Sequence, residues 1–387
     1  MNPGPYQHIP HASTTHYTHG SGRHPALAHT WHPALSRTWV RLTAVAVIAI
    51  SALLLASRAF SQESPRRDAE SLRISIFTPT TEGNTSWPEV HRIMRQAAAE
   101  LNLELAFHEF DVGDRFAKAD EGVEILQVSP VSDAAIFSVA YGQAEALMDA
   151  AEELGIPFFL HGPLFPEEVA QLGGGPRQSY EHWIGYFHED EELKGYLLAR
   201  ELITAARLAL RSNNRSLSTD TIRLVGVGGD TTWYGNVLRE AGLRRAVAES
   251  RDARLLQVVP TRWTQEEGRQ IASRLLYRYT DVAAIWAASD QLALGAAEAL
   301  EVADLHPGVD AFTGGLDFSR IGLEAVTAGR LSATVAAPIS MWADVLRYLS
   351  EYLHGNDFAD ETGARIIFEP QVATPDTVGA DIPAGDQ

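Results

Sequence analysis

Short apolar segments alternate with amphipathic segments along most of the chain, and this alternation restricts the fold more than any other feature. Nine segments have the length and composition of buried strands. Between them lie segments such as residues 87–101, whose apolar side chains recur at helical spacing. Strands that alternate with helices form parallel sheets with helices on both faces. The predicted strands are 74–77, 103–107, 134–137, 157–160, 182–186, 222–227, 255–259, 283–287 and 366–368.

The helix starts and the number of strands refine this prediction. Ser86 and Thr264 are each followed three positions later by a glutamate, Glu89 or Glu267, in the pattern of a capping box. Nine strands are more than one open sheet holds comfortably, and the polar stretch 211–220 interrupts the alternation without ending it. We therefore expect an α/β fold with two doubly wound parallel-sheet lobes.

An apolar run near the amino terminus predicts export. Residues 42–56 are uncharged, follow Arg37 and Arg41, and precede the small residues Ala59 and Ser61. This is the pattern of a secretory signal peptide with cleavage after Ser61, which predicts a periplasmic location. A single membrane anchor is the alternative, because an uncleaved segment of this length could nearly span a bilayer.

The forty residues before this run are rich in His, Pro, Thr and Ser. Their histidines follow no helical or strand period, and the spacing fits no metal-ligand geometry. We expect that the gene start has been placed too far upstream and that initiation near Val40 gives an ordinary short signal peptide. Residues 1–61 are thus interpreted as a signal peptide with a misassigned upstream start.

The composition excludes several classes of protein. The 387 residues include 31 Lys and Arg against 50 Asp and Glu, a net charge of −19, and removal of the four arginines in residues 1–61 leaves −23. Such a chain repels nucleic acid, which binds through clustered Lys and Arg, and also repels anionic lipid. The absence of cysteine excludes disulfides, thiolate zinc sites and a cysteine nucleophile. We expect no nucleic-acid partner, no metal and no cofactor.

The loops that follow the predicted strands contain aromatic, carboxylate and amide side chains. In open α/β sheets, ligands bind beyond the carboxyl ends of the strands. Aromatic rings can cover the C–H faces of a sugar, while charged and amide groups form hydrogen bonds with its hydroxyls. We therefore predict a small polyhydroxylated ligand. The candidate ligand-binding residues are Asn84, Ser86, Trp87, Tyr141, His161, Trp233, Arg239, Trp263, Ser289, Asp290 and Asp317.

Several of these candidates also have a purely structural interpretation. Trp87 and Trp263 could pack at the starts of helices. Asp290 could cap a helix, where the dipole favours a carboxylate, and Asp317 could belong to a turn. His161 could be a buried histidine with its hydrogen bonds satisfied inside the protein. These alternatives stay open at the level of sequence.

Motifs for catalysis are weak or absent. Residues 226–231 lack the third glycine of the dinucleotide fingerprint, and the chain has no P-loop, nucleophile elbow or zinc-protease helix motif. Asp290 and Asp317 could serve a glycosidase, whose two carboxyl groups need a fixed separation. A periplasmic glycoside-processing enzyme therefore remains an alternative, although we expect a protein that is not an enzyme.

Two stretches of the chain resemble a known family. Residues 286–296 form an apolar strand, Ser-Asp and a helix start, and residues 315–335 form a Gly-x-Asp turn, a helix and a glycine-led strand. Over residues 72–370 the chain resembles the periplasmic sugar-binding proteins of the ribose-binding type, with the type I periplasmic binding protein fold. Lactose-repressor relatives share this fold, but here residues 1–61 offer an export signal instead of a DNA-binding helix pair.

The resemblance implies roles for residues in both lobes. In the first loop Asn84, Ser86 and Trp87 match the family's ligand-binding positions, with one aromatic residue replaced by Ser86. Arg239 matches a sugar-binding arginine, and Trp263 matches an aromatic residue that stacks on the ligand.

The resemblance also extends to the second half of the chain, where departures from the family pattern appear. Asp317 matches a carboxylate that binds ligand hydroxyls, and Asp190 matches a position at the lobe crossover. The departures are Ser289 in place of Asn, Ala337 in place of Gln, and Gly162-Pro163 in place of Asp-Arg. These changes argue against ribose and favour a larger or less polar ligand.

The resemblance implies a binding protein whose two lobes close over the ligand about a three-segment hinge. We expect the chain to cross between the lobes near residues 188, 337 and 367. The partner is then an ABC transporter permease or, alternatively, a membrane histidine kinase or chemoreceptor that reads the closed form. The expected N-terminal lobe comprises 62–188 and 338–366, and the expected C-terminal lobe comprises 189–337 and 367–387.

Overall fold

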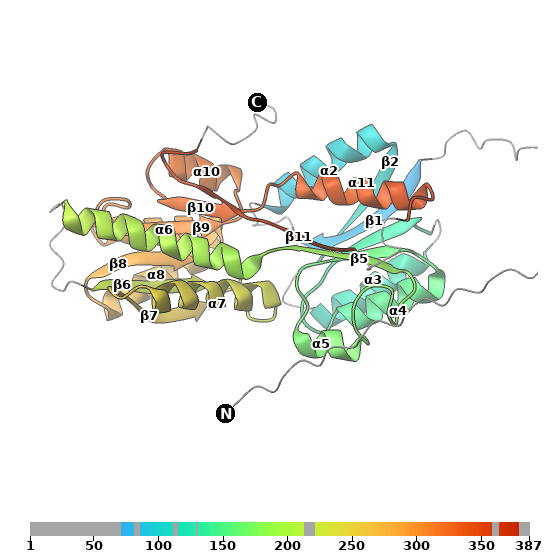
Figure 1. Ribbon diagram of the computed structural model, residues 1–387, viewed down its shortest axis with the longest axis horizontal. Coiled ribbons are helices and arrows are strands. Elements are labelled where there is room, and N and C mark those ends of the chain that lie inside the picture. The colour runs from blue at the N-terminus through green and yellow to red at the C-terminus, as the bar shows by residue number, and fades with distance from the viewer. Residues whose placement is uncertain are drawn as a thin grey trace, which may run out of the picture. The chain divides into compact units, whose positions relative to one another are not determined.

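Two six-stranded sheets form the framework of the chain (Figure 1). The protein is represented by a computed structural model that describes residues 71–80, 86–110, 115–128, 131–212, 221–357 and 364–378. These residues belong to one compact unit. The predicted signal peptide and Asn84 lie outside them. Within the described part of the chain, no helix is both long enough and apolar enough to cross a membrane.

The first sheet is entirely parallel, and together with its helices it forms what we call the N-lobe. Its strand order is β11-β5-β4-β3-β1-β2. The strands are β1 (Leu72–Pro79), β2 (Leu103–Phe110), β3 (Ala134–Ser138), β4 (Phe158–His161), β5 (Trp183–Glu189) and β11 (Ala364–Phe368). The helices are α2 (Trp87–Leu101), α3 (Arg115–Gln127), α4 (Ala144–Leu154), α5 (Pro166–Gln171) and α11 (Met341–Leu353).

The second sheet and its helices form the C-lobe. Its strand order is β12-β10-β9-β8-β6-β7, and only β12 is antiparallel to its neighbour. The strands are β6 (Ile222–Gly228), β7 (Ala253–Pro260), β8 (Val282–Ala287), β9 (Phe312–Leu316), β10 (Ala333–Ala336) and β12 (Gln371–Ala373). The helices are α6 (Glu191–Arg211), α7 (Tyr234–Glu249), α8 (Gln265–Arg278), α9 (Asp290–Val302) and α10 (Arg320–Thr327). The prediction of two doubly wound α/β lobes is confirmed.

Side-chain alternation along the N-lobe strands produces a separate core on each face of the sheet. Ile74 and Ile76 of β1 point into a core shared with α2 and α11, which pack together. Phe77 of the same strand points into the other core, with α3 and α4. Both faces of the sheet are therefore buried, as continuous apolar strands require.

The chain passes between the two sheets three times. The first passage follows β5 and enters α6, the second joins β10 to α11, and the third joins β11 to β12. We call these the first, second and third crossovers. They bring the carboxyl ends of the strands of both lobes toward one region.

Two glycines allow α6 and α7 of the C-lobe to approach closely. A Cβ atom on Gly195 would lie 1.9 Å from the carbonyl oxygen of Arg239, and one on Gly242 would lie 2.0 Å from that of Glu192. Larger residues at either position would force the helices apart. The close crossing places the first turn of α6 beside Arg239 of α7.

The structure differs from the sequence predictions in two respects. It adds β9 and β12 to the predicted strands, because β9 contains two glycines and β12 has only three residues. The strand β10 lies where the family resemblance implied a glycine-led strand. The Thr264 side chain accepts a hydrogen bond from Glu267 N and so caps α8 as predicted. The predicted capping box at Ser86 is wrong, because its side chain makes no cap hydrogen bond to α2.

Candidate functional site

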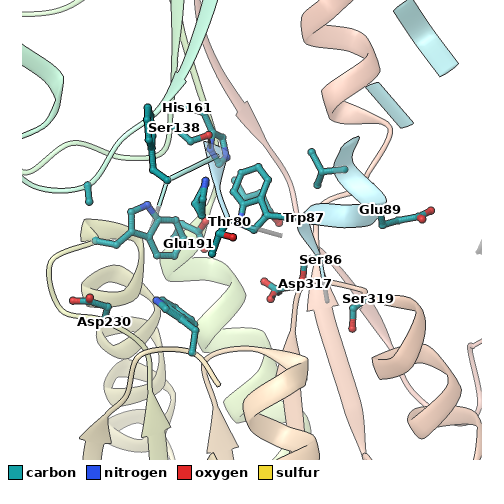
Figure 2. A pocket seen from close by; sticks show the side chains of 18 of the residues that line it. Thr80, Ser86, Trp87, Glu89, Ser138, His161, Glu191, Asp230, Asp317 and Ser319 are labelled. Carbon is teal, nitrogen blue, oxygen red and sulfur yellow. Dashed lines mark hydrogen bonds between the residues drawn. The ribbon is translucent and has the colours of Figure 1, made fainter. Parts of the chain in front are cut away.

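A cavity of about 940 Å³ lies between the carboxyl ends of the strands of the two lobes (Figure 2). This is where open α/β sheets bind ligands. Both lobes contribute side chains, and Figure 2 shows Trp87 and His161 of the N-lobe near Glu191 and Asp317. The predicted site residues that line it are Ser86, Trp87, His161, Trp233, Arg239, Trp263 and Asp317.

The N-lobe side of the cavity is an aromatic cluster around His161. The ring centroid of His161 lies 5.9 Å from that of Trp87, 4.4 Å from that of Trp342 and 4.9 Å from that of Phe187. Its Nδ1 forms a hydrogen bond of 2.9 Å with Ser138 Oγ. Burial lowers the pKa of His161 to about 3, so the ring is neutral near pH 7. The aromatic part of this wall is therefore uncharged, and Glu89, Glu109 and Glu189 of the same lobe also line the cavity.

The C-lobe side combines two tryptophans with an arginine. The guanidinium of Arg239 lies 4.8 Å from the ring centroid of Trp233 and 5.9 Å from that of Trp263, which are cation–π distances. A Cβ atom on Gly229 would lie 2.0 Å from the Trp263 ring. The absence of a side chain at Gly229 therefore permits the observed position of this ring.

Beneath these rings lies a buried cluster of ionised groups. Arg239 Nε donates to Glu191 Oε2 at 2.6 Å, and Arg239 Nη1 donates to the carbonyl oxygen of Ala288 at 2.6 Å and lies 3.4 Å from Asp317 Oδ1. Lys194 Nζ lies 2.8 Å from Glu189 Oε1, 3.5 Å from Glu191 and 3.9 Å from Asp317. Two cations thus face three carboxylates.

The pKa shifts follow this arrangement. The pKa of Glu191 is lowered, since Arg239 and Lys194 together outweigh the opposing effect of its burial. Burial raises the pKa of Asp317, and the attraction of Arg239 and Lys194 only partly opposes this effect. Asp317 also forms a hydrogen bond with the N-lobe, because Ser86 Oγ donates to its Oδ2 at 3.4 Å.

Three of the seven described non-glycine residues with positive φ lie at or next to this site. Trp263 has φ of 73°, Asp317 has φ of 112° and Phe318 has φ of 50°. Residues with a side chain seldom adopt positive φ, and such strain persists where the surroundings fix the conformation. Two of the three residues line the cavity. The fold therefore fixes the positions of the Trp263 ring and the Asp317 carboxylate.

The structure places Ser289 and Asp290 beside the cavity but outside its lining. Ser289 caps α9 by accepting from Leu292 N. Asp290 is fully buried, and its Oδ2 accepts hydrogen bonds from the Ser319 backbone N–H and hydroxyl at 2.9 and 2.8 Å. Burial, reinforced by the charge of Asp317, raises the pKa of Asp290 to about 7.

Tyr141 also lies outside the lining, at a direct contact between the lobes. Its backbone N–H donates to the carbonyl oxygen of Thr232 at 2.9 Å. Its ring packs edge-on against Phe165, which in turn lies 4.7 Å from the ring centroid of Tyr234 in the C-lobe. The loops after β3, β4 and β6 therefore touch beside the cavity.

Four of the site residues that were not predicted from the sequence form its charged cluster or its aromatic wall. Glu189, Glu191 and Trp342 line the cavity, and Lys194 pairs with both glutamates from a fully buried position. Asp190, which the family resemblance placed at the crossover, lies there between β5 and α6 and caps α6 by accepting from Leu193 N. The resemblance thus pointed to the correct turn, but the carboxylates at the cavity are the residues on either side.

The chain is similar to known proteins in sequence and fold. Residues 75–356 match the family model described as periplasmic binding protein domain. A periplasmic sugar-binding protein from Pseudomonas fluorescens is 25% identical with a TM-score of 0.69, and the match covers 81% of this chain and 90% of that one. No curated protein matches the chain.

Two further solved structures share the fold. An ABC transporter periplasmic solute-binding protein from Actinobacillus succinogenes with bound D-allose is 19% identical with a TM-score of 0.68, over 80% of this chain and all of that one. The arabinose-binding component from Shewanella sp. ANA-3, bound to L-arabinofuranose, is 16% identical with a TM-score of 0.63, over 80% and 94% of the two chains. The resemblance seen in the sequence is confirmed, and the chain belongs to the periplasmic binding protein family, with the fold of its ribose-binding type.

Proposed function

We propose that the protein is a periplasmic substrate-binding protein that captures a small polyhydroxylated ligand by lobe closure and delivers it to an ABC transporter permease. The observation that carries the proposal is the cavity between the lobes, where aromatic rings from both sides flank Arg239 and Asp317. Rings of this kind cover sugar C–H faces, and a carboxylate accepts from hydroxyls. The relatives with bound allose and arabinofuranose support a sugar ligand.

The charges of the cavity favour a neutral or cationic sugar over an acidic one. Its lining contains seven carboxylates and two arginines. Arg239 is already engaged by Glu191, and Arg262 lies beside Glu267 with its side chain 84% exposed. A ligand carboxylate would therefore meet a surplus of negative charge. We infer that uronic acids are rejected.

The position of Asp290 argues against a glycosidase. A glycosidase needs both of its carboxyl groups at the glycosidic bond. Asp317 lines the cavity, whereas Asp290 is fully buried and engaged by Ser319. We infer that Asp317 binds ligand without turnover and that Asp290 does not contact it.

Binding is tested by thermal shift and calorimetry with a panel of monosaccharides, disaccharides and polyols. We expect one neutral or amino sugar to raise the melting temperature and bind with one-to-one stoichiometry. Trp263→Ala should weaken binding, whereas Tyr277→Ala, a matched aromatic change at a residue of α8 that is 95% exposed, should leave it unchanged. Chemical consumption of a sugar, or equal binding by both variants, would contradict the proposal.

The delivery step needs a separate test in cells. Deletion of the gene should abolish uptake of the sugar identified by calorimetry. Normal uptake combined with a lost transcriptional or chemotactic response would instead identify a membrane kinase or chemoreceptor as the partner.

A further inference from the structure

The dipeptide Glu189-Asp190 joins the three crossovers at one point. Glu189 Oε2 accepts a hydrogen bond of 2.6 Å from the backbone N–H of Ala337 in the second crossover. Its Oε1 accepts from Lys194 Nζ at 2.8 Å, on the helix that begins the C-lobe. The next residue, Asp190, donates its backbone N–H to the carbonyl oxygen of Phe368 in the third crossover at 3.1 Å. One dipeptide therefore binds both of the other crossovers.

Lys194 connects this point with the cavity. Its side chain is fully buried, and its Nζ lies 3.9 Å from Asp317 as well as 2.8 Å from Glu189. Asp317 faces the ligand cavity, and so does Glu189 itself. A single ammonium group is thus shared among Glu189, which holds the hinge, Glu191 at 3.5 Å and Asp317 at the ligand cavity.

We propose that Glu189 is a positioning residue that couples ligand binding to lobe closure. A ligand hydroxyl that donates to Asp317 partly satisfies its negative charge, so Lys194 is held more strongly by Glu189. Because the group is buried, this redistribution is weakly screened by solvent. Through its hydrogen bond with Ala337, Glu189 then holds the second crossover in the conformation of the closed form. This inference rests on the proposed function, since it concerns closure over the same ligand.

The test uses charge variants with a matched control. Glu189→Ala removes both hydrogen bonds. Glu189→Gln keeps an acceptor for Ala337 N but removes the nearest of the three carboxylate charges that Lys194 faces. The double variant Glu189→Gln/Lys194→Met leaves no unpaired buried charge and is expected to fold if a single variant does not. Glu192→Gln is the control, because Glu192 of α6 pairs at the surface with Arg245 of α7 and does not line the cavity.

Closure is measured in the purified protein by small-angle scattering at saturating ligand, using the sugar identified by calorimetry. We expect the ligand-linked fall in radius of gyration to drop below half of the wild-type value in the Glu189 variants and in the double variant. The control should close fully. Full closure at saturation in Glu189→Ala, or in the double variant, would overturn the proposal.

A ligand-free measurement separates this inference from the proposed function. The chain has no cysteine, so cysteines introduced at exposed Glu153 of α4 and Arg274 of α8 can be spin-labelled selectively. Loss of the contact with Ala337 should broaden the distribution of label distances in Glu189→Ala and not in Glu192→Gln. If the wild-type protein binds no sugar, the proposed function fails alone. An unchanged width in Glu189→Ala would still overturn the role of Glu189.

Discussion

Replacement of the buried Asp290 by asparagine should stabilise the protein at neutral and alkaline pH. Asp290 is fully buried, and burial together with the nearby charge of Asp317 raises its pKa from 3.8 to about 7. The folded protein therefore binds this proton more tightly than the unfolded chain does. Its contribution to stability is complete below pH 3.8 and is lost as the pH rises to about 7.

The size of the effect follows from the interval between the two pKa values. From 3.8 to about 7 is roughly three pH units, and each corresponds to about 1.4 kcal/mol, so ionisation costs up to about 4 kcal/mol at pH 8. Asparagine mimics the neutral acid and retains an oxygen for the two donors of Ser319. The variant should thus exceed the wild type in stability at pH 8 and match it near pH 4.

The assay is urea unfolding of both proteins at several pH values between 4 and 8. The difference in unfolding free energy between variant and wild type isolates Asp290 from other groups, such as His161, that titrate in both proteins. A difference that does not change with pH, or a variant less stable than the wild type at pH 8, would refute the reasoning.

Three further predictions concern the cavity. Arg239→Ala leaves the buried Glu191 with only Lys194, so urea unfolding should show a loss of about 3–5 kcal/mol, and a loss below about 1 kcal/mol would contradict the buried pair. Asp317→Asn should weaken sugar binding by about 1.5–3 kcal/mol in calorimetry, and unchanged affinity would remove Asp317 from the site. Gly229→Val should displace the Trp263 ring, reduce affinity and change the near-ultraviolet circular dichroism, and an unchanged spectrum would show that the contact is not restrictive.

The sequence predicted sheets with helices on both faces, because continuous apolar strands can be buried only when helices cover both sides of the sheet. The runs at Ile74, Ile136 and Phe159 are buried on both sides in this way. The strand β9 was missed because Phe312–Leu316 contains two adjacent glycines, which carry no strand signal. Its place between β8 and β10 is set by packing of the whole lobe and not by its own residues.

The site residues in the loops at strand ends could be predicted from the sequence. The site residues that depend on the crossing of two helices could not. Trp263 and Asp317 stand out because large or charged residues follow apolar strands, whereas Arg239 lies on α7 and was indicated by the family resemblance. Glu191 and Lys194 lie in the first turns of a helix, where such residues are common for local reasons. Only the close approach of α6 and α7 makes Glu191 a partner of Arg239 and brings Lys194 into the same cluster, and local spacing does not encode these contacts.

The same helix crossing determines what a ligand must supply. The buried cluster contains three carboxylates and two cations, and Glu189 and Glu191 each receive a hydrogen bond of 2.8 Å or less from a cation. Asp317 has only longer contacts, 3.4 Å to Arg239, 3.9 Å to Lys194 and 3.4 Å to the Ser86 hydroxyl of the other lobe. A hydroxyl or ammonium donor on the ligand would improve the contacts of Asp317 most. Because Asp317 also faces Ser86, that donor would stabilise the lobes together, and affinity and closure would depend on the same carboxylate.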